Sequence, residues 1–332
     1  MNSIIRIATV GTSWITEAFM ESLRDVQGME LSAVYSREFA KARVLGAKYG
    51  CQKAFDDLEA LAAWDGIDAV YIASPNGLHV AQSRLFLQNG KHVLCEKPIA
   101  VAPAEYEELS GLADQKGLVY MEAILYMHHP GRRRIREAVG RLGNVSMARL
   151  DFSQLSSKYN SLMMGESPNI FNPAMAGGCL MDMGVYCVYP ALDWFGVPDS
   201  IAYTAGFAST GGDAYGNGLF IYPDKHVNIS LSKTGQGAIG CEILGDLATM
   251  RIGFAVEMSD VFIVHRDGQK ERVLRNYTRT ELMAAEAKSF LKYITKPDKM
   301  KEEYAQAKRQ TLEACRALEA MRGRAGIRLG QP

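Results

Sequence analysis

The sequence predicts an α/β protein in which a doubly wound parallel sheet is followed by an α+β domain with a mainly antiparallel open sheet. Over the first 122 residues, short runs that are apolar on both faces alternate with helical patterns, as expected of a parallel sheet covered by helices on each side. Beyond residue 149, apolar residues recur with a period of two, which is typical of strands with one buried face. The length of 332 residues suits about two domains.

The first domain is expected to span residues 1–122. Its strands are predicted from β-branched and other apolar runs, namely Ile4–Val10, Leu31–Tyr35, Ala69–Ala73, His92–Cys95 and Val119–Ala123. A helix is predicted to begin after Ser13, a residue type that caps helix N-termini, because Ile15, Phe19 and Leu23 then recur at helical spacing. Further helices are expected between the later strands.

The second domain is expected to span residues 123–332. Three alternating stretches predict strands, at residues 148–152, 227–231 and 239–243. Gly245-Asp246 and Asp267-Gly268 sit between such stretches, and each suits a two-residue hairpin turn. Helical spacing returns at 281–294 and 302–322, and these helices are expected to pack on the sheet or back onto the first domain.

The composition excludes several classes of partner. Lysine plus arginine and aspartate plus glutamate each total 37, so no net field favours nucleic acid or an anionic membrane. No apolar run approaches the roughly 18–20 residues that span a bilayer, and the N-terminus lacks the layout of a signal peptide, so a cytoplasmic location is expected. The six scattered cysteines are expected to be free thiols. His128-His129 lacks a partner at ligand spacing, and no metal site is expected.

The turn after the first expected strand has part of a dinucleotide-binding pattern. It reads Gly11-Thr12-Ser13-Trp14-Ile15-Thr16. Such a turn needs glycine first for the tight bend and small residues where backbone approaches the pyrophosphate and where helix packs on strand. Here one glycine is kept and two are replaced by small hydroxyl residues. Any strand–helix turn can use a single glycine, but the N-terminus of the first helix is where a dinucleotide phosphate is expected.

The end of the second expected strand indicates which dinucleotide would bind. An enzyme that prefers NAD usually has an acidic residue there for the ribose 2′-hydroxyl, whereas arginine suits a 2′-phosphate. This chain has Ser36-Arg37, with Lys41 one helical turn further on. The pattern favours NADP over NAD, although both cations could be ordinary solvated charges at a helix start.

Three further motifs make the family recognisable. They read Ser74-Pro75-Asn76-Gly77-Leu78-His79, Cys95-Glu96-Lys97-Pro98 and Gly177-Gly178-Cys179-Leu180-Met181-Asp182-Met183-Gly184-Val185-Tyr186. Together with the glycine turn, this set resembles the Gfo/Idh/MocA oxidoreductase family over nearly the whole chain. Tyr186, where many members have histidine, resembles the branch that holds dihydrodiol dehydrogenase, D-xylose dehydrogenase and glucose-fructose oxidoreductase. The chain departs from the family in its incomplete glycine pattern and at His128-His129-Pro130, where an arginine-containing segment before the proline is more usual.

The resemblance implies a Rossmann domain that binds NADP or NAD and a second domain that binds a sugar or polyol-type substrate. It further implies a cis bond between Lys97 and Pro98, and a homodimer or homotetramer formed through the C-terminal sheet. Four residues at the ends of two strands would line the nicotinamide and ribose pocket, together with Lys97: Ser74, Asn76, His79 and Glu96. A histidine in the first turn of a helix is about as often a surface or capping residue.

Lys97, Asp182 and Tyr186 are the expected catalytic residues. Hydride transfer from an alcohol needs a group that takes up the hydroxyl proton, and a phenol with a pKa near 10 does so at neutral pH only if a cation favours its phenolate. Lys97 can supply that cation. Asp182 and Tyr186 are four residues apart, so a helix would place both on one face, where Asp182 can orient either partner. Lys97 could instead transfer the proton, and in isolation Tyr186 reads as a core aromatic residue.

The sequence therefore predicts an NADP-dependent dehydrogenase or reductase that acts on a sugar, polyol or related hydroxyl compound. Three residues that flank the expected cleft between the domains are candidates for substrate contacts: Tyr126, Asn169 and Asn172. Two other functions stay open. One is a non-catalytic regulator that senses the dinucleotide, and the other is a glycosidase or epimerase that retains NAD.

Overall fold

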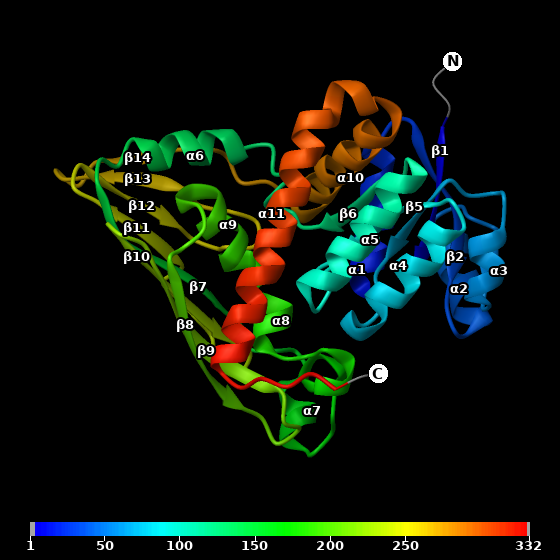
Figure 1. Cartoon of the computed structure of the whole chain (residues 1–332), viewed down its shortest axis with the longest axis horizontal. Helices are drawn as coiled ribbons and strands as arrows, with labels where there is room; N and C mark the ends of the chain where they lie inside the picture. Colours follow the sequence, from blue (N-terminus) through cyan, green and yellow to red (C-terminus); the bar gives the residue numbers. More distant parts are fainter. Residues whose placement is uncertain (1–3, 331–332) are drawn as a thin grey trace. The chain divides into compact units, whose positions relative to one another are not determined.

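The computed structural model describes residues 4–330 and divides them into two compact units (Figure 1). The first unit contains residues up to 128 and residues 278–311, and the second contains residues 129–277 and those from 312 onward. This differs from the predicted division after residue 122. Helix α10 (Arg279–Thr295) returns to the first unit because it packs against α1 (Trp14–Ser22) and the short helix η1 (Leu23–Asp25).

The first unit contains a six-stranded parallel sheet with the order β3-β2-β1-β4-β5-β6, so its predicted fold class is confirmed. The strands are β1 Ile5–Val10, β2 Met29–Tyr35, β3 Ala54–Phe55, β4 Ala69–Ile72, β5 His92–Glu96 and β6 Tyr120–Ala123. The two-residue β3 was not predicted because it is too short to form an apolar run. The strand order reverses between β1 and β4, and ligands of such sheets bind outside the carboxyl ends of the strands at this point.

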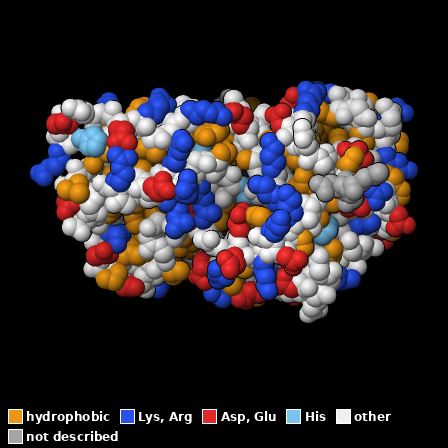
Figure 2. Space-filling view, turned by 90° about the horizontal axis from the view of Figure 1, so that it is seen from above, with side chains coloured by type: hydrophobic (Ala, Val, Ile, Leu, Met, Phe, Trp, Pro, Cys, Tyr) orange, Lys and Arg blue, Asp and Glu red, His pale blue; other side chains and the backbone are white. Residues whose placement is uncertain are grey.

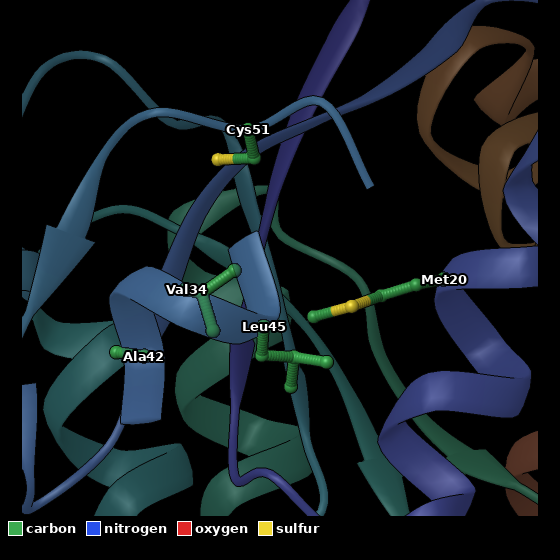
Figure 3. Packing of buried hydrophobic residues seen from close by; sticks show 5 residues of the cluster. All are labelled: Met20, Val34, Ala42, Leu45 and Cys51. Atoms are coloured by element: carbon green, nitrogen blue, oxygen red, sulfur yellow. The ribbon is translucent and has the colours of Figure 1, made fainter. Parts of the chain in front are cut away.

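Helices cover this sheet, and apolar side chains fill the layer between. The helices are α1, α2 (Phe39–Lys48), α3 (Leu58–Ala63), α4 (His79–Gln88) and α5 (Pro103–Lys116). Figure 3 shows one cluster of this core, in which Met20 of α1, Val34 of β2, Ala42 and Leu45 of α2, and Cys51 lie together. All six cysteines of the chain are buried free thiols, as predicted.

The second unit is built on an eight-stranded sheet with the order β14-β13-β12-β11-β7-β10-β9-β8. Its strands are β7 Val145–Ser153, β8 Ser200–Phe207, β9 Asp213–Ile221, β10 His226–Ser232, β11 Cys241–Gly245, β12 Ala248–Ile252, β13 Phe262–His265 and β14 Lys270–Arg272. All neighbouring strands are antiparallel except β7 and β10. The mainly antiparallel sheet is therefore confirmed, although Ile239 precedes β11 and is 72% exposed rather than inward-facing.

The remaining helices are α6 (Arg132–Gly140), α7 (Tyr159–Met163), α8 (Cys179–Met183), α9 (Val185–Phe195) and α11 (Pro297–Arg324). Helices α10 and α11 confirm the helical spacing predicted at 281–294 and 302–322. Within residues 4–330, no helix is both long and apolar enough to cross a bilayer. On the face that Figure 2 shows, basic and acidic side chains are interspersed. Association of copies through the eight-stranded sheet stays a prediction.

Candidate functional site

The turn between β1 and α1 requires glycine at its first position. Gly11 has a φ of +116°, and a Cβ there would lie 2.7 Å from the Ala73 carbonyl oxygen. Ser13 then caps α1 with extended backbone but no side-chain hydrogen bond to the helix. The first N–H groups of α1 consequently have no intrahelical acceptor at the edge where the strands end. This turn fits an anionic group such as a phosphate.

The end of β2 presents one uncompensated positive charge. Within residues 4–330, exposed Arg37 has no carboxylate at ion-pair distance, whereas Lys41 Nζ lies 2.6 Å from Glu38 Oε1. Ser36 is buried, and its hydroxyl accepts a hydrogen bond from the Glu38 N–H at 3.2 Å. Of the two predicted cations, Arg37 is therefore the one available to a ligand. A guanidinium beside a hydroxyl fits a ribose phosphate better than a bare ribose.

His79 connects the loops that follow β4 and β5. Its ring is fully buried, with Nδ1 2.8 Å from the Pro98 carbonyl oxygen and Nε2 2.8 Å from the Ser74 carbonyl oxygen. Burial lowers the pKa of His79, and a neutral ring donates to only one of these carbonyls. Because protein groups surround both nitrogens, we expect His79 to position the loops rather than to hydrogen-bond a ligand. The Lys97–Pro98 peptide is cis, as the family resemblance implied.

Lys97 follows β5 directly and is half-buried beside a buried carboxylate. Glu96 is 9% exposed, and its Oε1 accepts a hydrogen bond from the Tyr71 hydroxyl at 2.5 Å. Burial raises the pKa of Glu96, and the positive charges of Lys97 and Arg279 oppose this shift. Asn76 begins a short 3₁₀ turn, η2 (Asn76–Leu78), after β4. That Glu96, Asn76 and Ser74 line a cofactor pocket stays a prediction.

Another buried glutamate of the first unit was missed by the sequence reasoning. Glu286 of α10 is 1% exposed, and neither carboxyl oxygen has a hydrogen-bond partner among residues 4–330. Burial raises the pKa of Glu286 well above its usual range, and the nearby charges of Glu96 and Glu122 raise it further. Both effects favour the protonated, uncharged form of the Glu286 side chain. The available signal was its position between Met283, Ala287 and Phe290 on the apolar face of the helix.

Replacing Glu286 with glutamine should stabilise the protein above the ordinary glutamate pKa of about 4.3. The unfolded chain releases this proton above that pH while the folded chain retains it, so the wild-type free energy of unfolding falls as pH rises toward the folded-state pKa. Glutamine stays neutral throughout. The variant should match the wild type near pH 4 and exceed it by about 1.4 kcal/mol for each pH unit above the unfolded pKa, until the folded pKa is passed. Urea denaturation from pH 4 to 8 measures the difference.

The matched control for this prediction is Glu302→Gln, an exposed position at the start of α11. We expect no change in its stability relative to the wild type at any of these pH values. A constant difference between Glu286→Gln and the wild type across the range would contradict a protonated Glu286.

In the second unit, Asp182 and Tyr186 lie on two consecutive helices rather than one. Asp182 belongs to α8 and Tyr186 to α9, with Gly184 between them. Hydrogen bonds nevertheless continue through the junction, from Gly184 N–H to the Leu180 carbonyl at 2.8 Å and from Val188 N–H to the Gly184 carbonyl at 2.9 Å. Tyr186 is half-buried, with its ring edge-to-face against Phe152 at 5.2 Å. The backbone between Asp182 and Tyr186 is therefore helical in spite of the junction, as the four-residue spacing predicted.

Asp182 forms an ion pair with a lysine that the sequence reasoning missed. The Lys233 side chain is only 3% exposed, its Nζ contacts Asp182 Oδ2, and it lies 5.4 Å from the centre of the Phe171 ring. Lys233 directly follows β10, whose inward residues are Val227, Ile229 and Leu231. Position 233 continues that alternation, which is the signal that could have identified a buried lysine.

Gly177 and Gly178 allow close approach within the second unit. A Cβ on Gly177 would collide with the Asn169 carbonyl oxygen, and one on Gly178, whose φ is +139°, would collide with the Asp213 carboxylate. Asp213 is buried, and its Oδ2 accepts a hydrogen bond from the Leu180 N–H at 2.6 Å. These close contacts fix the backbone at the start of α8.

The three predicted substrate residues have different surroundings. Tyr126 is 1% exposed, so its ring is enclosed by protein. Asn172 caps the short helix η4 (Pro173–Met175) by accepting a hydrogen bond from the Ala174 N–H at 3.0 Å. Asn169 is exposed at the start of η3 (Asn169–Phe171). Asn169 is the one with a freely accessible side chain, and substrate contact stays a prediction for all three.

Comparisons with known proteins cover both units. The chain matches the model of an oxidoreductase family with an NAD-binding Rossmann fold over residues 5–124. It matches the GFO/IDH/MocA C-terminal domain over residues 133–251. The predicted family is thereby confirmed on both sides of residue 128.

Individual relatives agree with the family models. The chain is 36% identical to the scyllo-inositol 2-dehydrogenase (NADP(+)) IolU of Bacillus subtilis over 98% of each chain. It is 34% identical to D-xylose 1-dehydrogenase (NADP(+)) 2 of Haloferax volcanii over 67% of this chain and 66% of that protein. The crystal structure of KijD10, a 3-ketoreductase from Actinomadura kijaniata, shares the fold with a TM-score of 0.82 at 20% identity, covering 99% of both chains. The chain belongs to the Gfo/Idh/MocA family of oxidoreductases, whose first domain is an NAD-binding Rossmann fold.

Proposed function

We propose that the protein is an NADP-dependent dehydrogenase or reductase that transfers a hydride between the cofactor and a sugar, polyol or related hydroxyl compound. The observation that carries the proposal is the exposed Arg37 at the end of β2, which has no carboxylate partner among residues 4–330, beside a turn that requires Gly11. The relatives named as NADP-dependent dehydrogenases of scyllo-inositol and D-xylose support the cofactor and the substrate class.

The residues at the strand ends would each bind a different part of the cofactor. The turn of Gly11, Thr12, Ser13, Trp14 and Ile15 would hold the diphosphate through backbone N–H groups. Ser36 and Arg37 would hold the ribose 2′-phosphate, and Lys97 with Asn76 would lie at the nicotinamide end. When bound, NADP(H) accepts or supplies the hydride.

The proton is the part of the reaction that this chain's own residues would manage. Tyr186 would take the proton from the substrate hydroxyl as that carbon becomes a carbonyl, and it would return the proton in the reverse reaction. Lys97 would favour the phenolate by its positive charge. Asp182 would orient these groups, while Lys233 holds the Asp182 carboxylate in place. This assignment of roles to Lys97, Tyr186 and Asp182 is a proposal.

A two-stage experiment tests the proposed function. Purified protein is titrated with NADP⁺ and with NAD⁺ while its melting temperature is measured, because a ligand that binds only the folded state stabilises it by mass action. Sugars and polyols are then screened for formation of reduced cofactor by absorbance. We expect a larger shift with NADP⁺ and turnover of at least one polyhydroxy substrate. No shift with either dinucleotide would overturn the enzyme assignment.

Replacing Arg37 with methionine should remove the preference for NADP. A charge-assisted bond to the 2′-phosphate is worth about 1.5–3 kcal/mol, so the Kd for NADP⁺ should rise about tenfold or more. The Kd for NAD⁺ should stay within about twofold because NAD⁺ lacks that phosphate. Lys41→Met is the matched control, with a smaller expected effect because Lys41 already pairs with Glu38. Equal weakening of both dinucleotides by Arg37→Met would contradict the assignment.

A further inference from the structure

Helices α1 and α10 run side by side in the same direction, although about 265 residues separate their starts in the sequence. Near the beginning of both helices, Arg279 lies over the Trp14 ring. Further along the chain, η1, which follows α1, also packs against α10, and a Cβ on Gly28 beyond it would lie 3.4 Å from the Leu291 side chain. The parallel arrangement therefore brings the first residue of α10 to the glycine turn, at the edge of the sheet where the strands end.

Arg279 places a second cation at this edge. Its guanidinium carbon lies 5.1 Å from the centre of the Trp14 ring. Trp14 is the first residue of α1 and is 65% exposed, which is unusual for so large an apolar side chain. Arg279 also acts electrostatically on Glu96 at the end of β5. The guanidinium thus lies beside the first turn of α1, and its charge reaches the carboxylate at the end of β5.

This location is the point at which the strand order reverses. A dinucleotide that lies across such a point places its diphosphate against the N-terminus of the first helix. The N-terminus of α1 offers only partial positive charge and backbone donors. A guanidinium beside it adds a full positive charge and can form two parallel hydrogen bonds to phosphate oxygens. The helix end alone supplies no full charge.

We propose that Arg279 binds the diphosphate of the dinucleotide, with Trp14 holding the guanidinium over the glycine turn. This inference rests on the proposed function, which supplies the dinucleotide. The diphosphate is common to NAD and NADP, so Arg279 contributes affinity for both, whereas Arg37 distinguishes between them. The alternative is that Arg279 has a structural role, packed over Trp14 and not touching the dinucleotide, in which case its loss leaves dinucleotide affinity unchanged.

Calorimetric titration of Arg279→Met with NADP⁺ and NAD⁺ separates these alternatives. We expect the Kd of Arg279→Met to rise about tenfold or more for both dinucleotides. In Arg37→Met, by contrast, only the Kd for NADP⁺ should rise. Arg84→Met is the matched control, because Arg84 of α4 pairs with Glu108 of α5 and should leave both Kd values unchanged. Wild-type affinity for both dinucleotides in Arg279→Met would overturn the inference. Failure of the wild type to bind either dinucleotide would instead overturn the proposed function.

Tryptophan fluorescence gives a readout that does not depend on activity. If the dinucleotide lies against the glycine turn, its binding should change the emission of exposed Trp14. Trp14→Phe should remove most of that change while the protein still binds dinucleotide by calorimetry. Trp64→Phe is the control and should keep the change, since Trp64 packs against Phe55 on the strand β3 side. An unaltered fluorescence change in Trp14→Phe would also overturn the inference, because the ligand would then bind away from this turn.

Discussion

Replacing Tyr186 with phenylalanine should lower kcat by about 10²- to 10⁴-fold, the usual contribution of a positioned general acid or base. The substitution removes only the hydroxyl. The ring keeps its edge-to-face contact with Phe152 at 5.2 Å, so the variant should fold and melt like the wild type. The measurement is kcat and kcat/KM over a range of pH, with the fastest sugar or polyol of the screen as substrate. The rise of kcat with pH that reflects the proton acceptor should disappear.

Lys97→Met is the companion variant for this prediction. It should also lose activity, because the phenolate of Tyr186 would lack the cation that favours it. If Tyr186→Phe keeps full kcat at every pH while Lys97→Met loses it, the tyrosine assignment is wrong and Lys97 transfers the proton. Equal loss in both single variants and no further loss in the double variant would indicate that the two groups act as a unit.

The fold could be predicted largely because its two sheets differ in hydrophobic period. Runs buried on both faces identified the parallel sheet, and the alternation of Ala148, Leu150 and Phe152 identified β7, where all three are buried. The membership of α10 in the first unit could not be predicted in this way. An apolar face such as that of Leu282 and Phe290 shows that a helix is covered but does not show which sheet or helix covers it. The covering helix α1 is also far away in sequence.

Site residues that belong to a recognisable motif could be predicted from the sequence. Charged residues that are buried in the fold could not. Gly11 was expected from the turn pattern, and the cis bond before Pro98 was expected from the family resemblance. Lys233 and Glu286 were not, because lysine and glutamate are mostly exposed and are ordinarily assigned to the surface. Only the periodicity of their own strand and helix marks them as inward-facing. Arg279 was missed because its importance depends on the parallel packing of α10 and α1.

Replacing Lys233 with methionine should destabilise the second unit by about 2–3 kcal/mol, at or below the roughly 3–5 kcal/mol expected for breaking a fully buried ion pair, because the Asp182 side chain is 31% exposed. Methionine fills much of the same volume, so the loss reflects charge rather than a cavity. Two carboxylates lose their cation: Asp182, which the Lys233 ammonium contacts, and buried Asp213, whose raised pKa the Lys233 charge counteracts. Urea denaturation followed by circular dichroism measures the change.

Two comparisons identify charge as the cause. Lys225→Met removes a lysine whose partner Asp224 is exposed in the turn before β10, and a pair with a solvent-exposed carboxylate contributes about 1 kcal/mol or less. Asp182→Asn in the Lys233→Met background should recover part of the stability, because one uncompensated carboxylate is then removed; the two substitutions should therefore be non-additive. Strict additivity would mean that Lys233 stabilises α8 through its packing on Phe171, and the carboxylate of Asp182 would then need another group to hold it beside Tyr186.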